Sequence, residues 1–427
     1  MRISILSSRD EACGIAAYSS QLRQALEQLG HKASIHDIDN ARLRKRARSE
    51  LSRHFAGFIE NIDRFDAFIL QHEFGLYAVE FGMNKSNRPF GSLVAALAQR
   101  AKPAVVVFHS SPPPSTFGGV IRQERYRTDS IGRRGAVQML GASAFNTIRA
   151  FVVRPGLRAV LEAINDNPRI AGIVHTSEGR RLMIGSGLRA SKVNVIRHGV
   201  PKLEESVTLR HEGPANNDGV RNLAIFGFIA AYKGYEVALR ALLELPHNFK
   251  LIIAGGSHPA DPNERTLRSI LTFVATGDYP ASILPPLSRP ARESVRERLS
   301  GRVEITGYLE EDEIRTLLSR TSVVLAPYLP SGPLASGAVT WGLVARRPIV
   351  ATRTSGFAEL NEVEPCTLLV DPGSPAELAR AVMSICCNSK LESGLVAAAE
   401  RYAAAHAWPN AARQFSDRLA DLRERAF

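Results

Sequence analysis

The sequence predicts an α/β protein with two doubly wound, Rossmann-like domains that face a common cleft. Short apolar strands alternate with helix-length segments in both halves of the chain, and a polar stretch of weak periodicity, residues 201–220, separates the two series. Buried apolar strands that alternate with helices favour parallel sheets covered on both faces. The length of 427 residues allows two such domains, 1–200 and 221–408.

The first domain is expected to begin with a strand, a turn and a helix. Residues 2–7 alternate as a strand, residues 11–15 contain the turn glycine Gly14, and residues 16–30 have the spacing of an amphipathic helix that ends at a glycine. The same alternation continues along the chain. Strands are predicted at 67–70, 104–108 and 170–174, and helices at 92–100 and 142–151.

A second series of strands and helices follows the polar stretch. A proline-rich insertion near residues 284–290 interrupts it. Ligands of doubly wound sheets bind outside the carboxyl ends of the strands, so a ligand is expected between the two domains. The second-domain strands are predicted at 223–226, 250–254, 303–305, 322–326 and 348–351.

Composition excludes several classes of protein. Hydrophobic residues make up 44% and charged residues 22% of the chain, as in soluble globular proteins, and no apolar stretch approaches the roughly 18 residues of a membrane span. The four cysteines lack the spacing of zinc ligands, so reduced thiols and no metal are expected. The N-terminus lacks the apolar core of a secretory signal, which predicts a cytoplasmic protein.

The positive charge is concentrated in the first half of the chain. Residues 1–200 hold 29 basic and 16 acidic side chains, and the remainder holds 25 and 26. The basic residues gather in 42–53 and 122–158, and such a face suggests an anionic partner. An anionic membrane surface on the cytoplasmic side is one interpretation and a solvated basic face is the other. No nucleic-acid-binding signature is present, so no nucleic acid partner is expected.

Three motifs follow strands of the first domain. Gly14 would let the backbone approach an anion at a helix N-terminus, or it would simply permit a tight turn. His72 and Glu73 end a buried strand, and His109 ends the next one. A histidine in that position is either functional or a structural hydrogen-bonding group, and His109 is the stronger functional candidate.

Two motifs follow strands of the second domain. Gly227 and Lys233 lie between a strand and a helix, where a lysine suits a phosphate as a compact charge. Further along, the small residues Ser336, Gly337 and Ala338 enter a helix whose first free amides could hold a diphosphate. The alternative for this second motif is ordinary helix capping by Ser336.

Together these motifs resemble those of the retaining GT-B glycosyltransferases of family four, over nearly the whole chain. The resemblance implies that the second domain binds a nucleotide sugar and the first binds the acceptor. It also implies that the final helix, about residues 409–427, packs back on the first domain. The elements that carry it are the Gly14 loop, Gln71 to Gly75, His109, His175-Thr-Ser with Arg197-His-Gly-Val, Gly227 to Glu236, Ala254-Gly-Gly, Ser336 to Pro348 and Trp408.

The resemblance also implies roles for single residues. Lys233 and the amides of the Ser336 loop would hold the diphosphate, with Gly227 and Gly255 beside the donor, and Gly14 and His109 would face the reacting sugar. His72 and Glu73 would lie on the acceptor side. The catalytic residues would be His109 and Lys233.

The reaction implied is a retaining transfer from a nucleotide-diphosphate sugar to a glycan or lipid-linked acceptor, as in bacterial-type polysaccharide or glycoconjugate assembly. The departing diphosphate would act as the base, without a metal or a cofactor. Asp37 and Asp39 spell an Asp-x-Asp sequence, but they lie near the second strand of the first domain and are interpreted as structural.

The chain departs from the family pattern at three positions. Phe228 stands where an arginine is usual, and Pro333 and Trp341 stand where two glutamates are usual. Glu359 or backbone groups are the expected substitutes. The departures leave open a non-catalytic GT-B subunit of a polysaccharide assembly system. A Rossmann dehydrogenase is the weaker alternative, because no Gly-x-Gly-x-x-Gly follows a strand.

Overall fold

The computed structural model describes most of both predicted domains. The described residues are 1–8, 14–38, 55–73, 79–81, 84–86, 88–110, 157–201, 219–258, 261, 263–280, 282, 284–329 and 335–425. Several predictions lie outside them: the basic residues of 42–53 and 122–154, the helix predicted at 142–151, Asp39 and Pro333.

The first domain contains a parallel sheet of six strands in the order β2-β1-β3-β6-β7-β8. The predicted strands are confirmed, and β6 and β7 have the predicted bounds. A small antiparallel hairpin of β4 and β5 is added to this pattern. The strands are β1 (Arg2–Ser8), β2 (Lys32–Ile38), β3 (Ala67–His72), β4 (Val79–Phe81), β5 (Asn84–Ser86), β6 (Ala104–Phe108), β7 (Ile170–Val174) and β8 (Val193–Val195).

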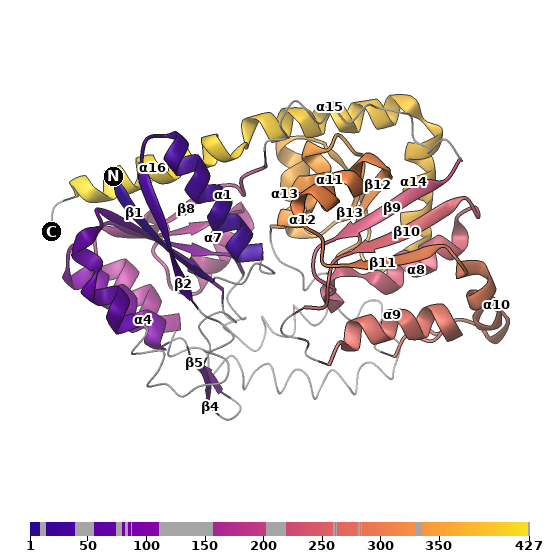
Figure 1. Ribbon diagram of the computed structural model, residues 1–427, viewed down its shortest axis with the longest axis horizontal. Coiled ribbons are helices and arrows are strands. Elements are labelled where there is room, and N and C mark those ends of the chain that lie inside the picture. Colours follow the sequence, from indigo (N-terminus) through magenta and orange to yellow (C-terminus); the bar gives the residue numbers. More distant parts are fainter. Residues whose placement is uncertain are drawn as a thin grey trace.

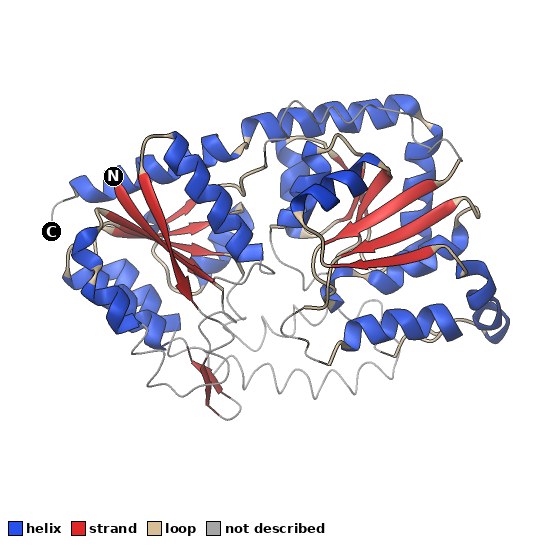
Figure 2. Cartoon of the chain, viewed as in Figure 1, coloured by secondary structure: helices blue, strands red, loops and turns tan. Residues whose placement is uncertain are grey.

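Helices cover both faces of this sheet (Figure 2). Alternate residues of each strand serve opposite faces: Ile5 packs toward α1 and the C-terminal helix, whereas Leu6 packs toward α4. The helices include α1 (Gly14–Gln28), α4 (Arg88–Gln99) and α7 (Ser177–Gly185), with 3-10 turns η1 (Ile62–Arg64) and η2 (Ala190–Lys192). Residues 55–60 and 157–166 are also helical.

The second domain contains another parallel sheet of six strands, in the order β11-β10-β9-β12-β13-β14. Numbered within the domain, this order is 3-2-1-4-5-6, the Rossmann order. The strands are β9 (Arg221–Phe226), β10 (Phe249–Ala254), β11 (Val303–Gly307), β12 (Thr321–Ala326), β13 (Ile349–Thr352) and β14 (Thr367–Val370).

The helices of this domain lie on both sides of the sheet, and α8 directly follows the 3-10 turn that ends at Lys233 (Figures 1 and 2). They are η3 (Ala231–Lys233), α8 (Tyr235–Glu244), α9 (Arg265–Thr276), α10 (Arg289–Leu299), α11 (Glu311–Ser319), α12 (Gly337–Val344), α13 (Ser355–Val363) and α14 (Pro375–Cys387).

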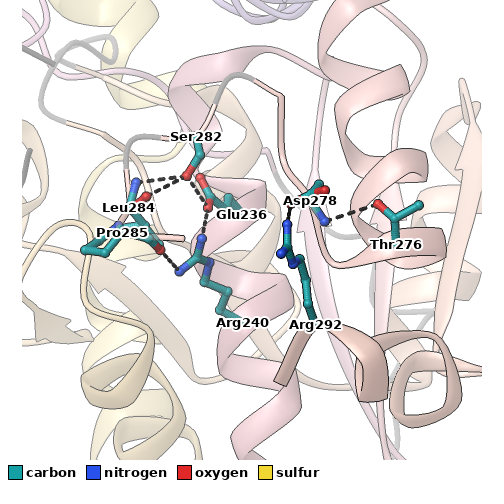
Figure 3. Close-up of polar contacts among 8 residues, drawn as sticks. All are labelled: Glu236, Arg240, Thr276, Asp278, Ser282, Leu284, Pro285 and Arg292. Carbon is teal, nitrogen blue, oxygen red and sulfur yellow. Dashed lines mark hydrogen bonds and ion pairs between the residues drawn. The ribbon is translucent and has the colours of Figure 1, made fainter. Parts of the chain in front are cut away.

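The proline-rich insertion is held to α8 by buried charges (Figure 3). Glu236 and Arg240, both on α8, form an ion pair of 2.6 Å with side chains only 4% and 11% exposed. Ser282 donates a hydrogen bond of 2.6 Å to Glu236, and Arg240 donates one of 2.6 Å to the carbonyl oxygen of Pro285. Glu236, at the end of the Lys233 motif, therefore has a structural role.

The C-terminal segment joins the two domains. The helix α15 (Ser389–Ala405) lies along the second domain, and α16 (Trp408–Glu424) lies along the first (Figure 1). Trp408, Phe415 and Leu419 are buried in the core of the first domain against α1. No helix in the described part of the chain is long and apolar enough to cross a membrane.

Candidate functional site

The second sheet changes its direction of winding between β9 and β12, which are neighbours. A ligand crevice opens at such a switch point, outside the carboxyl ends of the strands. Lys233 ends the 3-10 turn that follows β9, and Ser336 precedes the helix that follows β12. The two sequence motifs of this domain therefore border one crevice.

The Lys233 side chain is buried at this edge of the sheet, with 2% of its surface exposed. Its ammonium group donates hydrogen bonds to the carbonyl oxygen of Phe226 at 2.6 Å and to the hydroxyl oxygen of Tyr328 at 2.9 Å. An ammonium group has three N–H donors, so these two bonds leave one donor for a ligand. Burial lowers the pKa of Lys233, and an anionic ligand would reverse that shift.

Gly227 and Gly255 permit the close packing of the loop around this lysine. A Cβ atom on Gly227 would lie 3.1 Å from Lys233 Nζ and 3.4 Å from the Cβ of Ala338, and the φ angle of Gly227 is +88°. Gly227 therefore lies between the ammonium group and the first turn of α12. A Cβ on Gly255 would lie 2.3 Å from the carbonyl oxygen of Gly227, so Gly255 is required for the packing of this loop.

The start of α12 has no side-chain cap from Ser336. The Ser336 hydroxyl instead lies 2.9 Å from the hydroxyl of Tyr328. The capping interpretation of this loop is therefore not supported. The first amides of a helix carry partial positive charge and attract anions, so α12 directs a second electropositive group toward the crevice beside Lys233.

Five rings gather at the carboxyl edge of the first sheet. His109 follows β6, His175 follows β7 and His198 follows β8, while Tyr18 lies on α1 and Trp408 begins α16. Neighbouring ring centroids in this aromatic–histidine cluster are 4.8 to 5.7 Å apart. Of the five, the sequence assigned a site role to His109 alone. His175 and His198 could have been predicted as site residues from their positions directly after strands.

Burial lowers the pKa of all three histidines in the cluster, and neighbouring histidines add to this effect for His109 and His175. The pKa of His175 falls to about 3. His109 Nε2 is 2.7 Å from Gln71 Oε1, and His198 Nδ1 donates to the Gly199 carbonyl at 2.7 Å. These rings are therefore neutral near pH 7 and suited to hydrogen bonding rather than to proton donation.

The cluster and the start of α12 border the same space. A Cβ on Gly337 would lie 3.3 Å from His198 Nε2, the ring nitrogen that faces away from the Gly199 carbonyl. The histidine edge of the first domain thus meets the helix N-terminus of the second. At this contact, neutral hydrogen-bonding rings of the first domain meet the electropositive start of α12.

The other predicted residues of the first domain have different surroundings. Gly14 is the first residue of α1, and among the described residues a Cβ on it would meet no atom within 4 Å. The His72 ring is buried and lies against Phe90 and Phe108, and its acceptor-side role stays a prediction. Glu73 is partly buried and accepts a long hydrogen bond of 3.5 Å from Ser110.

Two of the side chains that depart from the family pattern, Phe228 and Trp341, pack against neighbouring side chains. The Phe228 ring lies edge-on to His258 at 5.5 Å, and the Arg315 guanidinium lies 5.9 Å from the Trp341 ring. The Glu359 carboxylate accepts hydrogen bonds from the amide of Ser177 in the first domain. These contacts do not support Glu359 as a donor ligand, because both of its oxygens are engaged elsewhere.

Comparisons with known proteins agree with this geometry. Residues 221–388 match the family model of the group 1 glycosyl transferases. An uncharacterized glycosyltransferase of Methanocaldococcus jannaschii is 23% identical over 193 residues, which are 45% of this chain and 46% of that protein. The chain thus spans about half the length of this curated relative.

Solved structures resemble the whole chain. HepE of Anabaena in complex with UDP is 15% identical, with a TM-score of 0.64 over 98% of this chain and 100% of that one. Sucrose-phosphate synthase of Thermosynechococcus elongatus is 15% identical, with a TM-score of 0.62 over 98% of both chains. WaaG, a glycosyltransferase involved in lipopolysaccharide biosynthesis, has a TM-score of 0.56 at 11% identity, over 97% of this chain and 98% of that one.

The fold is therefore GT-B, with two Rossmann-like domains that are each built on a parallel sheet of six strands. Within the second domain, residues 221–388 match the group 1 glycosyl transferases.

Proposed function

We propose that the protein is a retaining glycosyltransferase that moves a sugar from a nucleotide-diphosphate donor to a glycan or lipid-linked acceptor. The observation that carries the proposal is the position of Lys233, buried beside the start of α12 and opposite His198. HepE, which shares the fold, has been solved with UDP and with UDP-glucose, so a uridine diphosphate donor is the first to test.

In the proposed reaction, the bond between the anomeric carbon and the diphosphate oxygen breaks as the acceptor oxygen attacks from the same face. The acceptor proton passes to the departing diphosphate, which acts as the base. Lys233 and the amides of Gly337 and Ala338 would stabilise the charge that develops on that diphosphate, and Ser336 would lie beside it. His109, held by Gln71, would orient the reacting sugar.

The first test is a thermal-shift panel of nucleoside diphosphates and nucleotide sugars on the purified chain. A compound that stabilises the wild type but not the Lys233→Ala variant would support the donor site and name the base. Lys250→Ala is the matched control, because this lysine is exposed on β10 of the same domain. Stabilisation that persists unchanged in Lys233→Ala would remove the diphosphate assignment.

A non-catalytic GT-B subunit is the second candidate function. It is favoured by Phe228 and Trp341, which occupy the places of charged family residues and have structural contacts. Binding and turnover separate the two candidates. Release of UDP from UDP-glucose would support the enzyme, whereas nucleotide binding without release in the presence of candidate acceptors would support the subunit.

The acceptor and its membrane association form a separate part of the proposal, supported by the excess of 29 basic over 16 acidic residues in the first 200. Liposome sedimentation with and without anionic lipid tests it. Binding that rises with the anionic fraction and falls with salt is expected. Equal sedimentation with neutral and anionic vesicles would contradict a membrane-borne acceptor recognised through this charge.

A further inference from the structure

The Glu359 carboxylate connects the two domains at the edge of the crevice. It lies on α13 of the second domain and accepts hydrogen bonds from the amide of Ser177 at 2.7 and 2.8 Å and from that of Glu178 at 3.3 Å. These two amides open α7 of the first domain. Figure 1 shows α7 and α13 on the facing sides of the two domains.

The start of α7 depends on this contact between domains. The side chain of its N-cap residue, Thr176, accepts a hydrogen bond only from the third amide of the helix, that of Gly179, at 3.0 Å. The first two amides are satisfied by Glu359. A carboxylate is a favourable partner for them, because the N-terminal end of a helix is electropositive.

The guanidinium group of Arg197, in the first domain, also pairs with the Glu359 carboxylate. Arg197 lies 3.1 Å from Glu359, and the two side chains are 23% and 10% exposed. Arg197 directly precedes His198, whose ring meets Gly337 at the start of α12. Arg197 contacts Glu359 and the next residue, His198, contacts the start of α12, so the Glu359 contact lies beside the proposed reaction site.

We propose that Glu359 is a positioning residue, which holds the second domain against the first so that α12 faces His198 during sugar transfer. The inference rests on the proposed function. It differs from a donor-binding role, because Glu359 acts through the amides of α7 and through Arg197 and does not touch the nucleotide. Loss of the carboxylate frees α7 and Arg197 and lets the crevice open.

The test compares Glu359→Ala and Glu359→Gln with the wild type. Turnover of the donor is expected to fall at least about tenfold in Glu359→Ala, because small displacements of reacting groups are costly. The Kd of UDP should change less than about threefold, since Lys233 is untouched. Glu359→Gln keeps an acceptor for the α7 amides and should fall between the two. An equal loss of UDP affinity and turnover would overturn the proposal in favour of direct donor binding.

Glu364→Ala is the matched control. This carboxylate lies five positions further along the chain and pairs at 2.9 Å with Arg401 of the same domain. The Glu364→Ala substitution should leave donor turnover unchanged. Arg197→Ala should reproduce part of the loss, and the double variant with Glu359→Ala should add little to it. Additive losses would contradict a shared path through Arg197.

Small-angle X-ray scattering separates this inference from the proposed function. Opening of the crevice predicts a larger radius of gyration for Glu359→Ala than for wild type or Glu364→Ala, whether or not a nucleotide binds. If the wild type binds no nucleotide, the proposed function fails and the scattering still tests the contact. Unchanged scattering in a folded Glu359→Ala protein would overturn the positioning role.

Discussion

The ammonium group of Lys233 lies 2.9 Å from the hydroxyl oxygen of Tyr328. Because lysine can only donate, the tyrosine oxygen accepts this bond, and the hydroxyl of Ser336 lies 2.9 Å from the same oxygen. The bond holds Ser336 away from the α12 amides. A single buried tyrosine therefore orients the lysine and keeps the helix N-terminus open to an anion.

Tyr328→Phe is expected to weaken UDP binding several-fold. The substitution removes one hydrogen bond of Lys233, worth about 1 kcal/mol of stability, and releases Ser336 to cap α12 in competition with the ligand. Isothermal titration measures the affinity. Adding Ser336→Ala removes the competing cap, so the double variant should recover part of the affinity. A double variant as weak as Tyr328→Phe, or weaker, would show that capping is not the cause.

His109→Ala should lower donor turnover by at least about tenfold and leave the Kd of UDP nearly unchanged, because its role is to orient the sugar. His109→Gln keeps a polar side chain and should retain more activity. Steady-state kinetics and nucleotide titration provide the two measurements. The exposed His247 supplies the control substitution to alanine. Selective loss of nucleotide binding in His109→Ala would contradict this position for the residue.

The buried histidines predict acid sensitivity. The pKa of His175 is about 3 in the folded chain, below the ordinary value of 6.5, so the unfolded state binds the extra proton first. The contribution of neutral His175 to the free energy of unfolding is therefore fully present above pH 6.5, and it declines as the pH falls toward 3. At pH 5 the loss from His175 is about 2 kcal/mol. Urea unfolding of wild type and His175→Asn at pH 7.5 and 5 measures this, and equal pH slopes would refute it.

The contacts drawn in Figure 3 offer a matched pair of substitutions. Glu236→Ala removes the partner of a buried arginine and should lower the free energy of unfolding by about 3–5 kcal/mol. Arg292→Ala breaks the exposed pair with Asp278, whose side chains are 39% and 58% exposed, and should cost about 0–1 kcal/mol. Chemical denaturation compares them. Similar losses for the two would mean that the α8 pair is not held in a buried network.

Gly199→Ala should loosen the C-terminal helix from the first domain. A Cβ at this position would lie 2.3 Å from the Trp408 ring, so α16 must shift, at a cost of about 1–3 kcal/mol. Thermal unfolding and limited proteolysis of the C-terminal segment report the change. Gly185→Ala is the control, because its Cβ would meet nothing within 4 Å. Equal behaviour of the two variants would contradict the packing argument.

Much of the fold could be predicted because its strands are continuous apolar runs. The strands at 104–108 and 170–174 have the predicted bounds, since strands buried on both faces leave a clear signal. The short strands β8 and β14 were missed. The burial of His72 could not be predicted, because a position at a strand end does not say which face the ring covers.

The two-domain α/β architecture and the motifs around Lys233 and His109 could be predicted, because apolar periodicity and strand-end position are local properties of the chain. The grouping of side chains from different elements depends on the tertiary structure. It brought Tyr18, His175 and His198 to His109, freed α12 by turning Ser336 toward Tyr328, and engaged Glu359 with the other domain. These contacts join residues distant in sequence, and they depend on how two sheets and a crossing helix pack in space.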